Sequence, residues 1–255
     1  MPRPDVHVGT AGWSIPRAVA DGFPVEGSGL ERYAAVFDAV EINSTFYRSH
    51  RDSTYLGWAA CTRASFRFSV KAPRAITHDA RLVAVDEHLA RFLSELDPLR
   101  AKLGALLVQL PPSLAFDPSI AGAFFSALRK REPRLPVACE PRHVSWFSPA
   151  AESLLADVRV ARVAADPARH PLAGEPGGWT GFSYVRLHGA PRKYFSAYGP
   201  EAVADLAARL ERGQSAEAWC IFDNTGSGAA AADALELLRI VQPQRTCSGP
   251  GAAIA

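Results

Sequence analysis

The sequence predicts an α/β protein folded as a single (β/α)8 barrel, and three observations support that prediction. Eight short apolar runs alternate with amphipathic stretches, the order expected for a parallel sheet whose strands are connected by helices. The chain has 255 residues, close to the length that one such barrel needs. The apolar runs also end in polar residues, and the site of a barrel of this type forms at those strand ends.

The predicted strands are runs rich in Val, Ala, Ile and Phe. They cover residues 6–10, 39–43, 66–71, 104–110, a run that starts at Pro136, and then 158–165, 182–189 and 218–222. Helices are predicted over residues 30–38, 54–61 (capped by Asp52 or Ser53), 85–102, a segment that starts at Pro118, 149–157, 201–212 and 229–241. An open doubly wound sheet is the alternative, but no Gly-x-Gly-x-x-Gly motif follows the first strand.

One connection and the two chain ends complete this organisation. A Gly/Pro-rich loop over residues 170–180 replaces the helix after the sixth strand. We expect one domain over residues 1–255, with its core at 6–241 and a mobile tail at 242–255.

Composition and charge narrow the classes of function. The net charge is +2, so no global field favours nucleic acid or a membrane surface. No apolar run is long enough to span a bilayer, and the N-terminal residues lack the apolar core of a signal peptide. The four cysteines have no paired spacing, which indicates a reduced, cytoplasmic protein. No patch in the sequence stands out as an interface, so a monomer is the default expectation.

Every predicted strand contributes polar or special residues where it ends. These are Gly12 and Trp13, Glu41 and Asn43, Lys71, Gln109, Glu140 with Arg142 and His143, Asp166, Arg186 and His188, and Asp223 with Asn224. Because the C-terminal ends of barrel strands meet at one mouth, we expect these side chains to form one site.

Glu41 and Glu140 are the predicted acid–base groups. Both lie in apolar surroundings, which raise the pKa of a carboxylic acid and suit it to donate a proton. The alternative is that each carboxylate pairs with a cation, such as Lys71, Arg142 or Arg186, and holds the barrel mouth together.

A divalent metal is a second possibility at the same strand ends, although no particular cofactor is predicted. The candidate ligands are Glu140, His143, Asp166 and His188, with Asp223 as a further carboxylate. The sequence contains no His-x-His or His-x-x-x-His pair, so the spacing is unspecific. Each histidine could instead orient a neighbouring side chain.

Cations and aromatic residues surround the predicted mouth. The cations are Lys71, Arg74, Arg142, Arg186, Arg192 and Lys193, which suit an anionic substrate or, alternatively, internal salt bridges. The aromatic residues are Trp13, Phe46, Tyr47, Trp146, Tyr194 and Tyr198, which could stack on a base or sugar ring, or simply anchor loops.

An ordered series of motifs resembles a known family. It consists of Gly9-Thr10-Ala11-Gly12-Trp13, Glu41-Ile42-Asn43-Ser44-Thr45-Phe46-Tyr47-Arg48, Phe68-Ser69-Val70-Lys71-Ala72 with Thr77-His78, Gln109-Leu110-Pro111-Pro112, Glu140-Pro141-Arg142-His143 with Ser145-Trp146, Arg186-Leu187-His188-Gly189, and Asn224. This series is similar to the YecE-like proteins, also called domain of unknown function seventy-two. The resemblance implies a TIM-type barrel and no settled activity. The chain departs from the family pattern in the small residues at 18–22, in Asp223 before Asn224, and in Asp233.

These observations together predict an enzyme, a hydrolase or lyase that acts on a small or polymeric anionic substrate, phosphate- or sugar-bearing, at the C-terminal mouth of the barrel. Its catalytic residues would be Glu41, Glu140, His143 and His188. Its substrate-binding residues would be Trp13, Asn43, Lys71, Gln109, Arg142, Trp146, Arg186, Tyr198 and Asn224. The alternatives are a nucleic-acid-binding or metal-dependent endonuclease-like protein, and a ligand-binding barrel without catalysis.

Overall fold

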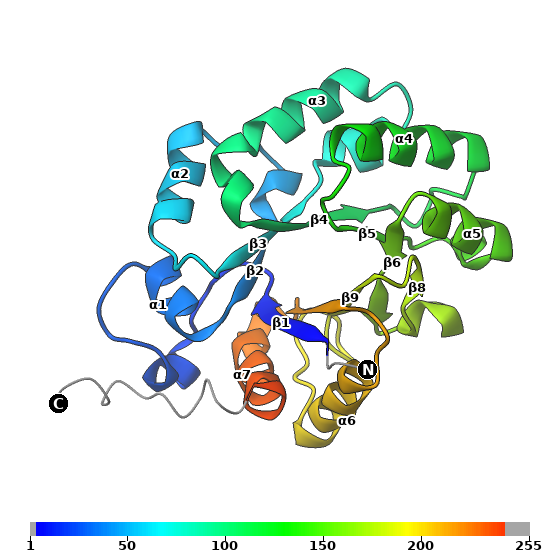
Figure 1. Cartoon of the computed structure of the whole chain (residues 1–255). Coiled ribbons are helices and arrows are strands. Elements are labelled where there is room, and N and C mark those ends of the chain that lie inside the picture. The colour runs from blue at the N-terminus through cyan, green and yellow to red at the C-terminus, as the bar shows by residue number, and fades with distance from the viewer. Residues whose placement is uncertain (1–3, 243–255) are drawn as a thin grey trace.

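The fold is an α/β barrel-like arrangement of parallel strands surrounded by helices, seen in a computed structural model that describes residues 4–242 (Figure 1). The strands are β1 (Asp5–Thr10), β2 (Ala39–Ile42), β3 (Arg67–Lys71), β4 (Leu103–Gln109), β5 (Val137–Glu140), β6 (Val160–Arg162), β7 (Ala164–Asp166), β8 (Gly177–Gly178), β9 (Phe182–Leu187) and β10 (Glu217–Phe222). The helices are α1 (Gly29–Val36), α2 (Asp52–Ala60), α3 (Asp86–Glu95), α4 (Pro118–Arg131), α5 (Pro149–Asp157), α6 (Pro200–Glu211) and α7 (Ala229–Val241). The predicted alternation of strands and helices is therefore confirmed.

Hydrogen bonding divides the strands into two sheets. One sheet has the order β1-β10-β9-β7, and the other has the order β2-β3-β4-β5-β6-β8, in which only the short β8 is antiparallel. Val163 alone separates β6 from β7, so the predicted sixth strand passes from one sheet to the other. A single parallel bridge between Ala11 and Glu41 links the other two edges. The strands thus follow barrel order, although their hydrogen-bond ladders do not close into a continuous ring.

The barrel interior contains a buried apolar layer directly below a polar one. Alternate side chains of a strand point to the same face. Ala39, Leu107, Ala138, Tyr184 and Ile221 belong to one buried interior cluster. Two residues after each of them comes a polar side chain, in the order Glu41, Gln109, Glu140, Arg186 and Asp223. The period of two therefore brings polar side chains from five strands to the same level of the interior.

Small residues inside the barrel make room for large rings. Tyr184 and Trp219 stack with ring centroids 6.0 Å apart, among alanines of β2, β4, β5 and β6. Gly9 of β1 is needed for a different close approach, because a Cβ atom there would lie 2.2 Å from the carbonyl oxygen of Ala39. The interior consequently depends on the exact sizes of several strand residues.

Most predicted element boundaries hold within a few residues, with two corrections. The long helix predicted over residues 85–102 ends at Glu95, and a 3-10 helix over Asp97–Lys102 follows, because Pro98 cannot donate the backbone hydrogen bond that continues an α-helix. The second helix begins at Asp52, with Arg51 as its N-cap, so neither Asp52 nor Ser53 is the cap. By contrast, Asp117 does cap α4, accepting from the backbone nitrogens of Ser119 and Ile120.

The connection after the sixth strand lacks an α-helix, as predicted. A short 3-10 helix over Pro171–Gly174 and strand β8 occupy the space between α5 and α6 (Figure 1). Gln242, the first residue of the predicted tail, donates from Nε2 to the carbonyl oxygen of Val6. The rest of that tail lies outside the described residues. Within residues 4–242, no helix combines the length and apolar character needed to cross a membrane.

Candidate functional site at the C-terminal mouth

The centre of the site is the guanidinium group of Arg186, which is completely buried at the end of β9. Its Nε and Nη2 atoms donate to the two carboxylate oxygens of Glu41, at 3.0 and 2.7 Å. Nη1 donates to Oε2 of Glu140 at 2.6 Å, and Nη2 also donates to Oδ2 of Asp223 at 3.0 Å. One cation thereby holds three carboxylates that come from β2, from β5 and from the residue after β10.

Glu140 has further partners that fix both of its carboxylate oxygens. Gln109 donates to Oε2 at 2.8 Å, and Arg142 donates to Oε1 at 3.3 Å. Nε2 of His188 lies 3.2 Å from Oε1, while its Nδ1 lies 2.9 Å from Oδ2 of Asp223. His188 therefore bridges two carboxylates, and this geometry suits an imidazole that donates from both nitrogens.

Two carboxylates of this network, Glu140 and Asp223, are held in their ionised form. Burial alone would raise the pKa of Glu140, but Arg186, followed by His188 and Arg142, outweighs it and holds the pKa well below its ordinary value. Burial would also raise the pKa of Asp223, but the positive charge of Arg186 and the hydrogen bond to His188 outweigh it and lower that pKa. The expectation of a raised pKa is thus wrong for Glu140. The alternative prediction, that this carboxylate pairs with a cation, is confirmed for Glu140, because its buried charge has cationic partners.

Two side chains below the network were not predicted as site residues. The hydroxyl oxygen of Tyr184 lies 2.9 Å from Oε2 of Glu41 and 2.8 Å from Oγ of Ser69. Burial and the charge of Glu41 raise the pKa of Tyr184 well above its ordinary value, so the phenol stays protonated and can donate to the carboxylate. Their positions two residues before Arg186 and Lys71 were the sequence signal that could have identified them.

Two lysines at the mouth have no acceptor among residues 4–242. Lys71, at the end of β3, is 9% exposed, and its Nζ lies 4.4 Å from the ring centroid of Phe46. Lys193, in the loop after β9, has its Nζ 4.9 Å from the ring centroid of Tyr194. Burial, then Arg186, lowers the pKa of Lys71 to about 8, and burial, then Arg142, lowers the pKa of Lys193 to about 8. Both amines titrate close to neutral pH.

The mouth contains a small cavity next to this network. Its lining includes Glu140, Arg142, Arg169, His188 and Lys193, and its volume of about 20 Å³ is room for a water molecule. The cations of this lining outnumber its carboxylate, so the cavity presents a positive surface.

A second group of predicted site residues lies beside the network and is joined by its own hydrogen bonds. The hydroxyl of Tyr198 donates to Oδ2 of Asp166 at 2.6 Å and accepts from the backbone nitrogen of Gly189 at 2.9 Å. Asn224 donates from Nδ2 to Oδ2 of Asp233 at 2.7 Å. Tyr198 and Asn224 thus hold the loop after β9 in place. The departure of Asp233 from the family pattern supplies the acceptor for Asn224.

Three of the remaining predicted residues, His143, Trp146 and Trp13, have structural partners outside the network. His143 caps a 3-10 helix and hydrogen-bonds Ser145, while the indole of Trp146 is buried and donates to the carbonyl oxygen of Leu114. Trp13 packs edge-on against Trp58. Asn43 directly follows β2, and its Oδ1 is buried without a hydrogen-bond partner among the described residues. The structure therefore does not join His143, Trp146 or Trp13 to the Arg186 network.

The possible metal ligands do not come together as a set. Glu140 and His188 belong to the Arg186 network, whereas Asp166 bonds Tyr198 and His143 bonds Ser145. Within residues 4–242, no group of three or more His, Cys, Asp or Glu side chains is arranged to hold a metal ion. The convergent carboxylates surround a guanidinium group instead.

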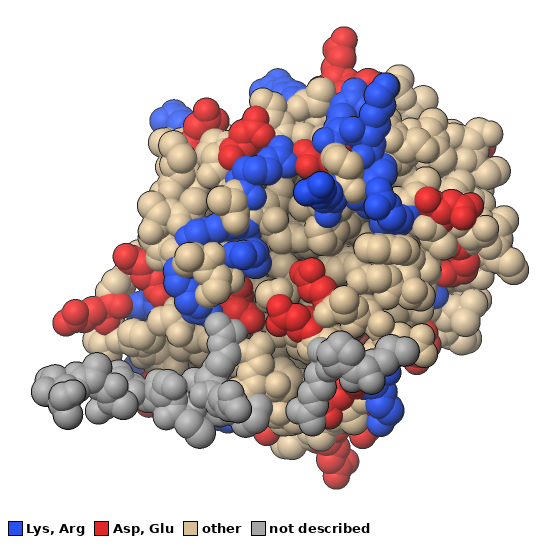
Figure 2. Space-filling view, viewed as in Figure 1, with Lys and Arg blue, Asp and Glu red and all other residues tan. Residues whose placement is uncertain are grey.

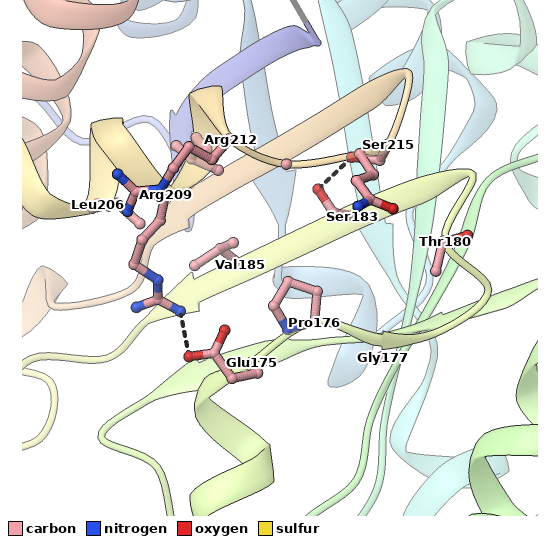
Figure 3. Close-up of a pocket in the computed structure, with 13 residues that line it drawn as sticks. Glu175, Pro176, Gly177, Thr180, Ser183, Val185, Leu206, Arg209, Arg212 and Ser215 are labelled. Atoms are coloured by element: carbon pink, nitrogen blue, oxygen red, sulfur yellow. Dashed lines mark hydrogen bonds and ion pairs between the residues drawn. The ribbon is translucent and has the colours of Figure 1, made fainter. Parts of the chain in front are cut away.

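A larger cavity, of about 450 Å³, lies away from the Arg186 network. Figure 3 shows it between α6, the start of β9 and the segment that leads into β8. Arg209 lies 3.4 Å from Glu175 there, and the hydroxyls of Ser183 and Ser215 are 3.0 Å apart. None of the predicted site residues lines this cavity.

Strands in barrel order, an outer layer of helices and an ionic network at the strand ends define an α/β-barrel protein of the TIM type. The family model "Protein of unknown function DUF72" matches residues 7–253, and the chain belongs to that family. The UPF0759 protein YecE of Escherichia coli (strain K12) is 32% identical over 143 residues, which cover 56% of this chain and 50% of YecE. The matched region thus spans half the length of that relative. The UPF0759 protein YunF of Bacillus subtilis (strain 168) is 23% identical, covering 92% of this chain and 94% of YunF.

Solved structures share the fold. A DUF72 family protein of Thermotoga maritima MSB8 superposes with a TM-score of 0.76 at 25% identity, covering 93% of this chain and 99% of its own. A DUF72 family protein of Enterococcus faecalis V583 superposes with a TM-score of 0.77 at 21% identity, covering 92% of this chain and 95% of its own. A D-psicose 3-epimerase superposes with a TM-score of 0.54 at 11% identity, covering 96% of this chain and 98% of its own. This is a likeness of fold alone.

Proposed function

We propose that this protein is an enzyme, a hydrolase or a lyase, that binds a small anionic substrate at the C-terminal mouth of the barrel. The observation that carries the proposal is the pair of amines at the mouth, Lys71 and Lys193, neither of which has an acceptor among the described residues. A phosphate or carboxylate group of a substrate supplies the missing acceptor.

The proposed roles differ from residue to residue. Arg142 and Lys193 line the cavity and hold the anion, while Lys71 comes to the mouth from the end of β3. Arg186 is fully buried and its donors are occupied by carboxylates, so it positions Glu41, Glu140 and Asp223 rather than binding substrate. His188, between two carboxylates, is the group that passes a proton at the cavity wall.

The ionised state of Glu140 favours a lyase over a glycosidase. A retaining glycosidase needs a protonated carboxylic acid beside a nucleophilic carboxylate. Glu41 and Glu140 instead share the Arg186 guanidinium, and the pKa of Glu140 is held well below its ordinary value by Arg186 and its other cations against the effect of burial. An amine supplies a further acid–base group, since burial, then Arg186, lowers the pKa of Lys71 to about 8.

Nucleic acid is the less favoured ligand. The face seen in Figure 2 carries basic side chains in groups with acidic ones among them, rather than as a continuous basic strip. The net charge is only +2, which is low for a protein that neutralises many backbone phosphates. A gel shift that shows nucleic-acid binding, with an affinity that falls steeply between low and moderate salt, would support nucleic acid over a small anion as the ligand.

The proposal is tested by calorimetric titration with inorganic phosphate, phosphorylated sugars and sugar acids, followed by NMR detection of any turnover. The double variant Arg142→Gln, Lys193→Gln removes two of the anion's partners, and Arg209→Gln removes a surface cation as the matched control. We expect binding in the wild type and control, at least about tenfold weaker in the double variant, in line with losing two charge-assisted hydrogen bonds. Equal binding by all three proteins, or none by the wild type, would overturn the proposal.

A further inference from the structure

Lysine is scarce in this chain, and each of the four lysines has a distinct environment. Of the 28 Lys and Arg residues, the lysines are Lys71, Lys102, Lys130 and Lys193. Lys102 donates to the carbonyl oxygens of Ala59 and Thr62 and to the Thr62 hydroxyl, so its ammonium is fully occupied. Lys130 is exposed on α4. Only the two lysines at the mouth combine partial or deep burial with the absence of an acceptor among the described residues.

Lys71 has the environment of a nucleophilic amine. The sequence places it two residues after the buried Ser69, so that its side chain follows Ser69 into the barrel interior. Its Nζ is not one of the solvent-excluded unpaired atoms within residues 4–242, so the amine keeps some contact with solvent. The ring of Phe46 covers one side of the amine. Burial, followed by the positive charge of Arg186, disfavours the ammonium form, and Glu41, Glu140 and Asp223 oppose this only in part.

We propose that Nζ of Lys71 condenses with the carbonyl group of a small anionic aldehyde or ketone to form an imine, an inference that rests on the proposed anionic substrate. The nitrogen lone pair attacks the carbonyl carbon, and the carbonyl oxygen takes up a proton while the nitrogen loses one. The resulting hydroxyl group takes a second proton and leaves as water, as the nitrogen lone pair forms the C=N bond. No oxidant or reductant is required. The protonated imine then withdraws electrons from the neighbouring carbon, as a lyase requires.

The other groups of the mouth fit this chemistry. His188 can deliver the proton that the departing hydroxyl needs, because its two nitrogens lie at the carboxylates of Glu140 and Asp223. Arg142 and Lys193 would hold the anionic end of the same molecule. Lys193 is the weaker candidate for the imine, since it lies on a loop and is only half-buried, whereas Lys71 is anchored at the end of a strand.

Reductive trapping tests the inference directly. The full-length protein is treated with glyoxylate and sodium cyanoborohydride at pH 7, and labelled lysines are mapped by peptide mass spectrometry. Acetaldehyde, of similar size but neutral, is used in parallel. The hydride from cyanoborohydride adds to the imine carbon, and the nitrogen takes a proton, so each imine becomes a stable secondary amine. Lys130 is the internal comparison, and Lys71→Arg keeps the charge but removes the primary amine.

We expect glyoxylate to label Lys71 at least about tenfold faster than Lys130. A pKa of about 8 rather than 10.5 makes the free amine about 300 times more populated at pH 7, a gain that its lower basicity partly offsets. Lys71→Arg should lose this label, while Lys130 in the same variant is labelled as in the wild type. Labelling of Lys71 no faster than Lys130, by either aldehyde, would overturn the imine even if phosphate binds. Rapid labelling by acetaldehyde without any binding of phosphate would leave the imine standing and overturn the anionic substrate.

Discussion

Replacing Arg186 by Met is the sharpest perturbation of the buried network. The substitution deletes four hydrogen bonds to Glu41, Glu140 and Asp223 and leaves three carboxylates in the interior without their shared cation. Removing one partner of a buried ion pair typically costs about 3–5 kcal/mol. We expect the free energy of unfolding to fall by at least that amount at pH 7.5. Arg209→Met, which removes an exposed ion pair with Glu175 and a hydrogen bond to the carbonyl oxygen of Gly174, should cost about 1 kcal/mol or less.

The pH dependence of that loss tests its electrostatic cause. In the wild type the pKa values of Glu140 and Asp223 lie below their ordinary values because Arg186 outweighs burial, so both groups remain ionised between pH 7.5 and 5.5. In the variant, burial still acts but the largest opposing charge is gone, although His188 remains beside both carboxylates and Arg142 beside Glu140, so both pKa values rise above those of the wild type. As the pH falls, the folded variant therefore takes up more protons than the folded wild type, and the gap in stability between the two proteins narrows.

The assay is urea unfolding of wild type, Arg186→Met and Arg209→Met at pH 7.5 and 5.5. The double variant Arg186→Met, Glu41→Gln should be more stable at pH 7.5 than Arg186→Met, because it buries one unpaired charge fewer. A loss for Arg186→Met that is the same at both pH values would refute the electrostatic reasoning and leave only a packing defect. So would an Arg186→Met protein as stable as the Arg209→Met control.

Two further predictions concern other parts of the barrel. Lys71→Met should stabilise the protein by up to about 3 kcal/mol at pH 7, since each of the pH units between 10.5 and a pKa of about 8 is worth about 1.4 kcal/mol. The penalty of burying Lys71 is fully present below pH 8 and disappears as the pH rises towards 10.5, because the unfolded chain binds the extra proton in that window. The unfolding curves of wild type and Lys71→Met should therefore differ at pH 7 and lie close together at pH 10. Gly9→Ala should lower stability by about 1–3 kcal/mol, because its Cβ would lie 2.2 Å from the Ala39 oxygen. Gly57→Ala, in α2 with nothing within 4 Å of the new Cβ, should instead raise stability by about 0.5–1 kcal/mol, and a thermal melt that reversed these signs would contradict the packing described.

The strand order and the polar strand ends were accessible from the sequence. Buried parallel strands appear as apolar runs, and the period of two shows which residues share a face. Glu41, Glu140 and Arg186 could therefore be assigned to one mouth before any coordinates were known. The helix after residue 85 was drawn too long because its apolar stripe continues past Pro98 into a 3-10 turn.

The partners within the mouth were not accessible in the same way. The residues that a carboxylate meets depend on which strands adjoin across the barrel, and this fixes the balance of burial against charge that sets the pKa of Glu140. His143 and Trp146 have side chains common in binding sites and follow a strand that ends at the mouth. Even so, His143 hydrogen-bonds Ser145 and Trp146 donates to the carbonyl oxygen of Leu114. The loops after the strands determine such directions, and loop geometry leaves little trace in residue periodicity.

The position of a bound anion tests the central claim most directly. A crystal soaked with selenate, located by its anomalous scattering, should show the anion at the mouth, within hydrogen-bond distance of Lys193 and Arg142. An anion found only elsewhere on the surface, with both mouth lysines still lacking an acceptor, would contradict the assignment of this mouth as the substrate site.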